Sequence, residues 1–378
     1  MLAHAPLLAQ TLSPSVEYNN YLKSNFDYFA EAKEAEFAEY NGYFYLLHAR
    51  YEEAITSMKK ALDEDPQNEN IKQELANTLV LKKRYAEAAS LLEYEEQIQN
   101  PIFNFLRYPR MAYQIKANRI TLPFFNDYYT NCSINGVADT LFLDTGVRVT
   151  LMSRSYAQKH GIRIDSLDME ETLTGNAYQS QWDSGLIPRI SLGDSIILEN
   201  VPCFIVEDGV FTQFGIRNQL VFGLDFLMLF DQVEFDYAEQ QFIASLIEDR
   251  SAELRPNFHL LGLTPVTSVA LSGERVNAFI DTGSPSTYIY ESERFNAGDR
   301  EPSKTVEKEF RGYAYTDKYY AFAVKSGVCW NGQMDLKIRA SRNTDPEYKK
   351  DLLIGNETWL EGSLLLDFKH NYCCFQTD

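Results

Sequence analysis

A segment that occurs twice, 137 residues apart, is the feature that most limits how this chain can fold. Residues 141–146 read Leu-Phe-Leu-Asp-Thr-Gly, and residues 278–283 read Ala-Phe-Ile-Asp-Thr-Gly. A hairpin pattern with a turn signal precedes each copy, at Asn135-Gly136 and at Ser272-Gly273. Because each apolar run is short and ends at a glycine, both copies predict a strand that leads into a tight turn.

Each copy has the same companions further along the chain. Some 70 to 80 residues later, three apolar residues precede a glycine, at 220–223 and again at 352–355. A strand pattern with an acidic-aromatic pair follows each of them, at 234–237 and at 366–368. The sequence therefore predicts a β-rich region in which a whole domain is duplicated.

The first hundred residues have a different composition. Residues 16–99 contain a single glycine, Gly42, and many Ala, Glu, Lys and Leu, as helices do. The pattern Arg-Tyr-x-Glu-Ala occurs at 50–54 and at 84–88, offset by 34 residues. This resembles the tetratricopeptide repeat, a helical hairpin with small residues where the helices cross. An ordinary helical bundle is the alternative interpretation.

The repeats predict helical hairpins at about residues 36–69 and 70–100, with a preceding helix at about 17–34. Two repeats are fewer than the three usually needed for independent stability, so we expect the helices to pack against the rest of the chain. We expect them to dock near the cleft between the lobes, through apolar residues of the connector. Those residues are Phe103, Phe105 and Tyr108.

The β region, residues 116–378, resembles the aspartic proteases. The strand that ends in Asp-Thr-Gly and the later apolar-apolar-Gly are the two signatures of that family. Each lobe has the length of a retropepsin-like subunit rather than of a full pepsin-like lobe. The resemblance implies a multidomain protein with an N-terminal all-α part and an all-β, bilobal protease. The predicted parts are a signal-peptide remnant or disordered terminus (1–15), a tetratricopeptide-like helical domain (16–100), a connector (101–115), lobe 1 (116–250) and lobe 2 (251–378).

The resemblance implies that Asp144 and Asp281 are catalytic and meet across the interface between the lobes. Two adjacent carboxylates cannot both ionise easily, so they share a proton and titrate as a pair. One then activates a water molecule as a base while the other donates a proton to the scissile carbonyl. The residues implied to support the two loops are Thr145 and Gly146 in lobe 1 and Thr282, Gly283 and Ser284 in lobe 2.

One position departs from the family pattern. The residue after Asp-Thr-Gly is usually Ser or Ala, and lobe 2 keeps Ser284 whereas lobe 1 has Val147. Because valine cannot donate a hydrogen bond to Asp144, we expect the two aspartates to be electrostatically unequal. The family also implies a flap in each lobe. The candidate flap and substrate-binding residues are Gly175, Asn176 and Tyr178 in lobe 1 and Gly312, Tyr313 and Tyr315 in lobe 2, with exposed hairpins as the alternative.

Charge and cysteine usage exclude other classes. The chain has 35 basic and 54 acidic residues, a net charge of −19, which is unsuited to nucleic-acid binding. No apolar run is long enough to span a membrane. The five cysteines are scattered without a CxxC pair, so neither a metal site nor a cofactor is implied. Cys132, Cys203, Cys329, Cys373 and Cys374 are expected to be mainly buried and apolar in role.

The sequence therefore predicts an aspartic endopeptidase that acts on a peptide or protein substrate. The alternative is a non-catalytic peptide-binding or scaffold protein that retains the protease fold. We expect a monomer, since both signatures lie in one chain, and a protein partner for the helical domain is a further expectation. The apolar stretch before Pro14 favours an extracytoplasmic location, periplasmic or secreted, with a cytoplasmic location as the alternative.

Overall fold

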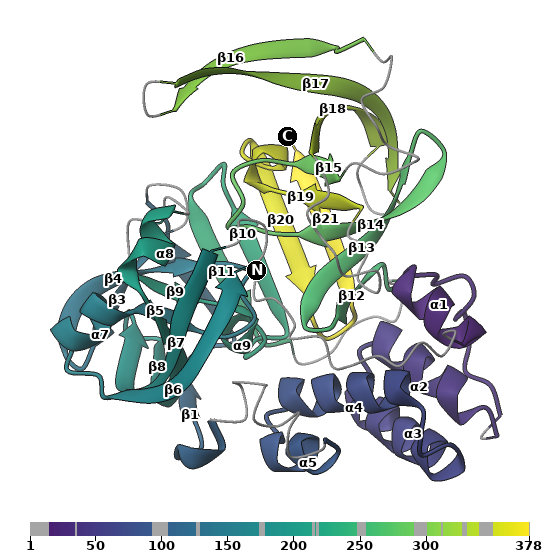
Figure 1. Cartoon of the computed structure of the whole chain (residues 1–378), viewed down its shortest axis with the longest axis horizontal. Coiled ribbons are helices and arrows are strands. Elements are labelled where there is room, and N and C mark those ends of the chain that lie inside the picture. The colour runs from purple at the N-terminus through teal and green to yellow at the C-terminus, as the bar shows by residue number, and fades with distance from the viewer. Residues whose placement is uncertain are drawn as a thin grey trace.

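The computed structural model describes residues 15–34, 36–92, 105–125, 129–173, 178–213, 216, 219–247, 255–290, 301–310, 313–326, 331–339 and 351–377. Helices form one end of the molecule, and two β-rich lobes form the rest (Figure 1). None of the described helices is long and apolar enough to cross a membrane.

The helical part contains the two predicted hairpins, so the tetratricopeptide-like arrangement is confirmed. Gly42 marks a close crossing, because a Cβ atom there would lie 2.8 Å from Cγ of Met58. The predicted helix at 17–34 is wrong in length, since it ends at Leu22 and turns follow. The helices are α1 (Val16–Leu22), α2 (Ala38–Leu47), α3 (Tyr51–Glu64), α4 (Glu69–Leu81) and α5 (Tyr85–Ser90).

Lobe 1 contains an eight-stranded sheet in the order β1-β8-β5-β9-β4-β3-β7-β6. The last residues of the predicted connector belong to it, because β1 pairs with β8 at its edge. Its strands are β1 (Ala112–Ile115), β3 (Tyr129–Ile134), β4 (Val137–Leu143), β5 (Leu151–Ser153), β6 (Ile164–Leu173), β7 (Tyr178–Leu192), β8 (Ile196–Val206) and β9 (Leu220–Phe222). Its short helices are α7 (Arg154–Lys159), α8 (Asp208–Gln213) and α9 (Leu224–Leu227).

Lobe 2 repeats the strand pairings of lobe 1. A second eight-stranded sheet has the order β12-β13-β14-β19-β15-β18-β17-β16. Once the additional pairings β7–β8 and β13–β17 are included, and apart from the edge strands β1 and β12, each strand from β13 to β19 pairs with the same neighbours as the lobe 1 strand ten numbers lower. Its strands are β12 (Phe258–Leu261), β13 (Thr264–Leu271), β14 (Glu274–Ile280), β15 (Tyr288–Tyr290), β16 (Lys304–Phe310), β17 (Tyr313–Ser326), β18 (Asn331–Arg339) and β19 (Leu352–Ile354), followed by the 3-10 helix η2 (Asn356–Thr358).

A third sheet joins the lobes and places them face to face. It has the order β2-β11-β10-β20-β21, and β10 of lobe 1 pairs antiparallel with β20 of lobe 2. Phe235 on β10 lies opposite Leu364 on β20, and both side chains are fully buried. The sheet is built from β2 (Arg119–Pro123), β10 (Gln232–Asp236), β11 (Gln241–Ser245), β20 (Gly362–Asp367) and β21 (Tyr372–Thr377).

The helical part docks mainly on lobe 2, through polar contacts as well as apolar ones. Nδ2 of Asn371 donates to the carbonyl oxygens of Leu46 at 2.7 Å and Leu47 at 3.0 Å, at the end of α2. The hydroxyl of Tyr51 donates to Oδ1 of the same asparagine at 3.3 Å. These bonds reach carbonyl groups at the helix end that lack the usual α-helical N–H donor four residues later.

A second part of the interface involves α1 and β12. The ring of Tyr21 packs against the ring of His259 with centroids 5.0 Å apart, and its hydroxyl donates to the carbonyl of Leu260 at 3.4 Å. Burial lowers the pKa of His259 to about 3, so this histidine is neutral and structural. Phe105 of the connector packs on Phe204 of lobe 1, as expected for a docking residue, whereas Phe103 lies outside the described residues.

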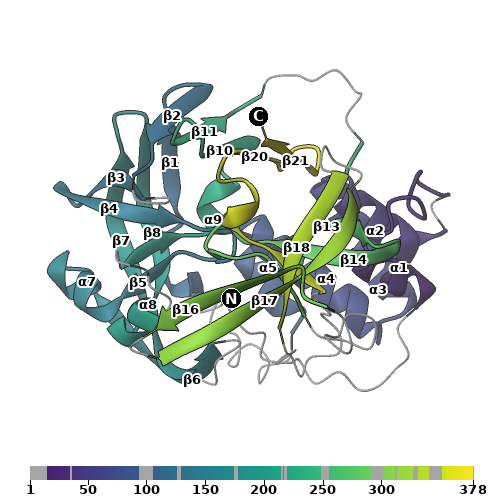
Figure 2. The ribbon, with the colours of Figure 1, turned by 90° about the horizontal axis from the view of Figure 1, so that it is seen from above.

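The structure places the helices away from the lobe 2 hairpin that carries predicted flap residues. The hairpin of β16 and β17 extends from lobe 2 across the top of the molecule, and the helices lie at the opposite end (Figure 1). Seen from above, the same hairpin reaches toward the side of lobe 1 that carries α8 (Figure 2). The described helices therefore contact the lobes at a distance from β16 and β17, and their expected docking near the cleft stays a prediction.

Candidate active site

The two Asp-Thr-Gly segments form loops that are held in the same way. Asp144 follows β4, and its N–H donates to the carbonyl of Phe222 on β9 at 3.0 Å. Asp281 follows β14, and its N–H donates to the carbonyl of Ile354 on β19, also at 3.0 Å. In both lobes the two strands are parallel, so the motif with the aspartate is fixed to the motif with the glycine.

Each apolar-apolar-Gly motif ends in a residue that must be glycine. A Cβ atom on Gly223 would lie 2.2 Å from the carbonyl oxygen of Val147. A Cβ atom on Gly355 would lie 2.4 Å from the carbonyl oxygen of Ser286. Since real Cβ atoms do not approach backbone so closely, any side chain at either position would push the loop away from its strand.

The two threonines brace the loops against each other. The N–H of Thr145 donates to Oγ1 of Thr282 at 3.0 Å, and the N–H of Thr282 donates to Oγ1 of Thr145 at 3.0 Å. Oγ1 of Thr145 in turn donates to the carbonyl of Ile280 at 2.9 Å. Both side chains are almost completely buried, so these hydrogen bonds form in a medium where an unpaired polar group is costly.

The carboxylates of Asp144 and Asp281 lie together between the loops. Oδ1 of Asp144 accepts from the N–H of Gly146 at 2.7 Å and from the N–H of Gly283 at 3.1 Å. The same N–H of Gly283 lies 3.1 Å from Oδ1 of Asp281. Each carboxylate also contacts the glycine of the opposite loop. A Cβ atom on Gly146 would lie 2.4 Å from Oδ1 of Asp281. A Cβ atom on Gly283 would lie 2.2 Å from Oδ2 of Asp144.

This environment favours a shared proton. Asp144 is only 6% exposed, and burial is the main cause that raises its pKa to about 7, with the charge of Asp281 as the second cause. Asp281 is half-buried whereas Asp144 is buried, so the two carboxyl groups have unlike surroundings. The arrangement can hold one ionised and one protonated carboxyl group side by side near neutral pH.

The residues that differ between the loops have backbone roles. Val147 is buried, and its carbonyl accepts from the N–H of Leu224 at 2.9 Å. The carbonyl of Ser284 accepts from the N–H of Asn356 at 2.8 Å, which is the equivalent bond in lobe 2. The hydroxyl of Ser284 donates to the carbonyl of Ser286 at 2.9 Å, so its one hydrogen does not reach Asp281.

The predicted flap residues are only partly within the described residues. Gly175, Asn176 and Gly312 lie outside them. Tyr178 begins β7, and Tyr313 and Tyr315 lie on β17, so their backbones belong to two long hairpins. The pairing of β6 with β7 and of β16 with β17 gives each lobe one hairpin at the place where the family has its flap. Their role in substrate binding stays a prediction.

Two further pairs support the loops and were not singled out from the sequence. Thr150 donates to Oδ2 of Asp225 from its N–H at 3.0 Å and from Oγ1 at 2.9 Å. In lobe 2 the N–H of Thr287 donates to Oε1 of Glu357 at 2.6 Å. The sequence contains a pattern that indicates both pairs, because each threonine follows its aspartate by six residues and each acid follows its glycine by two.

The remaining candidate groups have structural surroundings. The cysteines among the described residues, Cys132, Cys203, Cys373 and Cys374, are buried. Nε2 of His160 lies 2.9 Å from Oδ2 of Asp139 on the far side of lobe 1. No group of His, Cys, Asp and Glu within the described ranges could hold a metal ion.

Comparisons with known proteins agree with this arrangement. Residues 130–228 match the family model of the gag-polyprotein aspartyl protease, and residues 45–100 match that of the tetratricopeptide repeat. A retropepsin-like aspartic protease from Rickettsia conorii is similar at 17% identity with a TM-score of 0.27, over 36% of this chain and 96% of that chain. No curated protein matches. The chain thus joins a tetratricopeptide-like helical part to a β-rich region, in which lobe 1 carries the match to the aspartyl protease family.

Proposed function

We propose that this protein is an aspartic endopeptidase whose catalytic pair is Asp144 and Asp281. The observation that carries the proposal is the shared N–H of Gly283, which lies 3.1 Å from a carboxylate oxygen of each aspartate. Two carboxyl groups this close favour a state in which they hold one proton between them. Such a pair supplies an acid and a base at the same point.

The chemistry follows from that single proton. A water molecule between the carboxyl groups loses a proton to the ionised carboxylate as its oxygen attacks the peptide carbonyl carbon. The protonated carboxyl group donates its hydrogen to the carbonyl oxygen, so no full negative charge develops there. The tetrahedral intermediate then breaks its C–N bond: the carboxyl group that took the water proton passes it to the leaving nitrogen, and one hydroxyl group of the intermediate returns its proton to the other carboxylate as it becomes the carbonyl of the acid product. The backbone N–H groups of Gly146 and Gly283 hold Asp144 in position throughout.

The proposal includes a monomeric active unit. Both loops come from one chain, and the sheet through β10 and β20 fixes them to each other. The cleavage rate per molecule should therefore be independent of enzyme concentration. A steep loss of specific activity on dilution would mean that lobes pair between chains instead.

The test is digestion of a proteome-derived peptide library at several pH values, with and without pepstatin. We expect internal cleavage that pepstatin blocks and that the Asp281→Asn variant does not show. If the protein binds peptides from the library but leaves them intact at every pH, the alternative of a peptide-binding scaffold replaces this proposal. A matched variant, Asp194→Asn in the exposed β7–β8 turn, should cleave as the unaltered protein does.

A further inference from the structure

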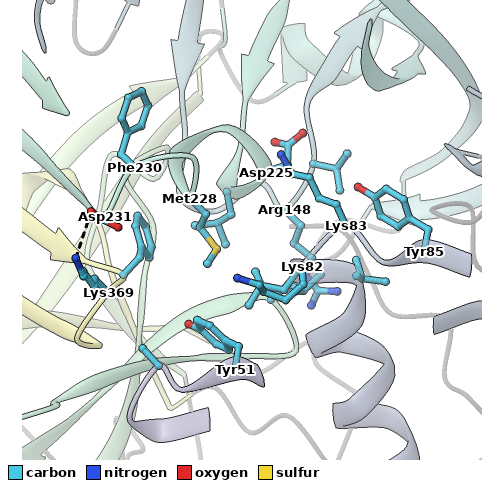
Figure 3. Close-up of a pocket in the computed structure, with 17 residues that line it drawn as sticks. Tyr51, Lys82, Lys83, Tyr85, Arg148, Asp225, Met228, Phe230, Asp231 and Lys369 are labelled. Atoms are coloured by element: carbon cyan, nitrogen blue, oxygen red, sulfur yellow. Dashed lines mark ion pairs between the residues drawn. The ribbon is translucent and has the colours of Figure 1, made fainter. Parts of the chain in front are cut away.

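A cavity of about 280 Å³ lies where the helical part meets both lobes. Lys82, Lys83 and Tyr85 border it from the helical side, Arg148 and Asp225 from lobe 1, and Lys369 from lobe 2 (Figure 3). Arg148 directly follows Val147 and the Asp-Thr-Gly loop of lobe 1. The cavity therefore lies beside the base of this loop, and Asp144 and Asp281 do not line it.

The charge of this cavity is opposite to that of the protein. Four cationic side chains line it, namely Lys82, Lys83, Arg148 and Lys369, against two acidic ones, Asp225 and Asp231. Nζ of Lys369 lies 3.8 Å from Oδ2 of Asp231, so these two charges balance each other. Lys82, Lys83 and Arg148 then line the cavity with Asp225 as the remaining acid, and Arg148 also interacts electrostatically with the buried Glu74, in a chain with a net charge of −19. The local excess of positive charge favours an anionic ligand.

Among the four cationic residues of the cavity, Lys83 gives the strongest evidence for a bound anion. Its Nζ is buried and has no hydrogen-bond partner among the described residues. The side chain extends toward Asp225 (Figure 3), but that carboxylate already accepts hydrogen bonds from Thr150 and from the N–H of Phe226. Burial lowers the pKa of Lys83 to about 8, although Asp225 opposes the shift. An ammonium group without acceptors is costly unless something else binds it.

The helical repeat itself shows that this lysine is not required by the fold. Ala49 occupies the equivalent position 34 residues earlier, and both residues have the left-handed backbone, with φ of 55° and 58°. Both also line the cavity. The first repeat thus closes its turn with a methyl group, whereas the second places an ammonium group in the cavity.

The other walls of the cavity are apolar and aromatic. Tyr51, Tyr85, Met228, Phe230 and Phe368 contribute to them. Ligand sites commonly combine such walls with a few polar groups that fix the orientation of the ligand. A small inorganic anion would use the cationic groups and leave the apolar walls uncovered.

We propose that this cavity binds a small organic anion, in which a carboxylate or phosphate group is attached to an apolar or aromatic body. Lys83, Arg148 and Lys82 receive the anionic group, and the rings of Tyr51 and Phe368 cover the body. The site is separate from the proposed catalytic pair. It contacts that pair only through the loop, where the N–H of Asp225 donates to the carbonyl of Arg148 at 3.1 Å.

The test uses four probes with the full-length protein, namely phenylacetate, phenyl phosphate, neutral phenylacetamide and inorganic phosphate. We expect at least one of the two aromatic anions to bind in calorimetry and to raise the melting temperature. Phenylacetamide should do neither, and inorganic phosphate should bind more weakly than the better aromatic anion. The comparison of phenylacetate with phenyl phosphate identifies which anionic group the site prefers.

Lys83→Met should weaken binding of the preferred anion about tenfold, as expected for one charge-assisted hydrogen bond. Lys60→Met, a change of an exposed lysine on α3, is the matched control and should leave binding unaltered. Because loss of Lys83 could affect folding, a second measurement uses the unaltered protein. The methyl resonance of Met228, assigned with Met228→Leu, should shift when the anion is added.

Any one of three results would contradict the proposed anion site. If no aromatic anion binds below about 10 mM, if Lys83→Met binds as well as the unaltered protein, or if the Met228 resonance does not move, the proposal is wrong. Binding should also persist in Asp281→Asn, so that it does not depend on the proposed peptidase activity.

Discussion

The two lobes provide the same loop from the same strands, yet they place it in different surroundings. In each lobe the aspartate N–H bonds to the strand with the glycine motif, and a threonine six residues later bonds to an acid. Behind lobe 1, Asp225 faces a cavity with Lys83. In lobe 2 the equivalent acid, Glu357, is exposed.

The contrast between the lobes indicates which of their contacts need to be symmetric. The hydrogen bonds that position the carboxyl groups are matched almost bond for bond, including the reciprocal pair between Thr145 and Thr282. The residues one layer further out are not matched, because the helical part contacts each lobe differently. The symmetry of side-chain contacts is therefore closest at the groups that set the geometry of the carboxylates.

The largest expected effect tests whether the lobes contribute equally to chemistry. Asp144→Asn and Asp281→Asn should each reduce peptide cleavage at least about 10³-fold, because either change removes one of the two acid-base roles. Steady-state cleavage of a library-derived peptide measures this, with circular dichroism to show an unaltered fold. Substantial turnover by one of the two variants would show that the lobes are not equivalent partners.

The pH dependence sharpens the same comparison. With the pKa of Asp144 raised to about 7, cleavage should fall about tenfold per unit as the pH rises above 7, since the shared proton is lost. The folded pKa lies above the usual value of 3.8, so the folded state binds this proton more tightly and stability should decrease between about pH 4 and pH 7.

Asp144→Asn should therefore be more stable than the unaltered protein at pH 8 and similar to it at pH 4. Urea unfolding at the two pH values measures the difference. A stability gain of the same size at both would contradict the assigned titration.

The threonine brace tests whether the two loops depend on each other. Thr145→Val and Thr282→Val should each lower the free energy of unfolding by about 1–3 kcal/mol, because each leaves a buried backbone N–H without its acceptor. The double variant should cost less than the sum, since the two bonds are reciprocal. Strictly additive losses would mean that the loops are held independently.

The smallest expected effect concerns the helical part, which only lobe 2 binds in this way. Asn371 and Gln240 occupy equivalent turns and share a left-handed backbone, with φ of 49° and 54°. Asn371→Ala loses its bonds to Leu46 and Leu47, whereas Gln240 is exposed. Asn371→Ala should therefore lower stability by about 1 kcal/mol more than Gln240→Ala, measured by urea unfolding. Equal losses would show that these bonds contribute nothing to docking.

Much of the site could be predicted because its constraints are local. Asp144, Thr145 and Gly146 form a short motif that depends on its own strand and on one distant glycine, and both copies repeat it. The helical hairpins were predictable for the same reason, since Ala and Tyr recur at a fixed period. The pairing of Thr150 with Asp225 could also be predicted from its spacing, but only by comparing the two copies of the motif position by position.

The docking of the helical part could not be predicted in the same way. Asn371 and Leu46 are 325 residues apart, and nothing about an asparagine in a turn indicates which carbonyl groups it will meet. The extent of α1 also depends on tertiary contacts, because the chain turns after Leu22 to reach lobe 2. Lys83 has an ordinary helix-end sequence, and only the fold shows that its ammonium group enters a cavity.

The sheet that joins β10 to β20 bears on the direction in which the proposed peptidase would hold its substrate. In a dimer of identical subunits, every substitution appears on both sides of the twofold axis that relates the subunits. A bound peptide then contacts the same surface in either of its two chain directions. Here the halves are encoded separately, and Val147 already differs from Ser284. A cleft with unlike halves can accept a peptide in one direction and reject the reverse, so the N-terminal and C-terminal sides of the cleaved bond can be selected independently.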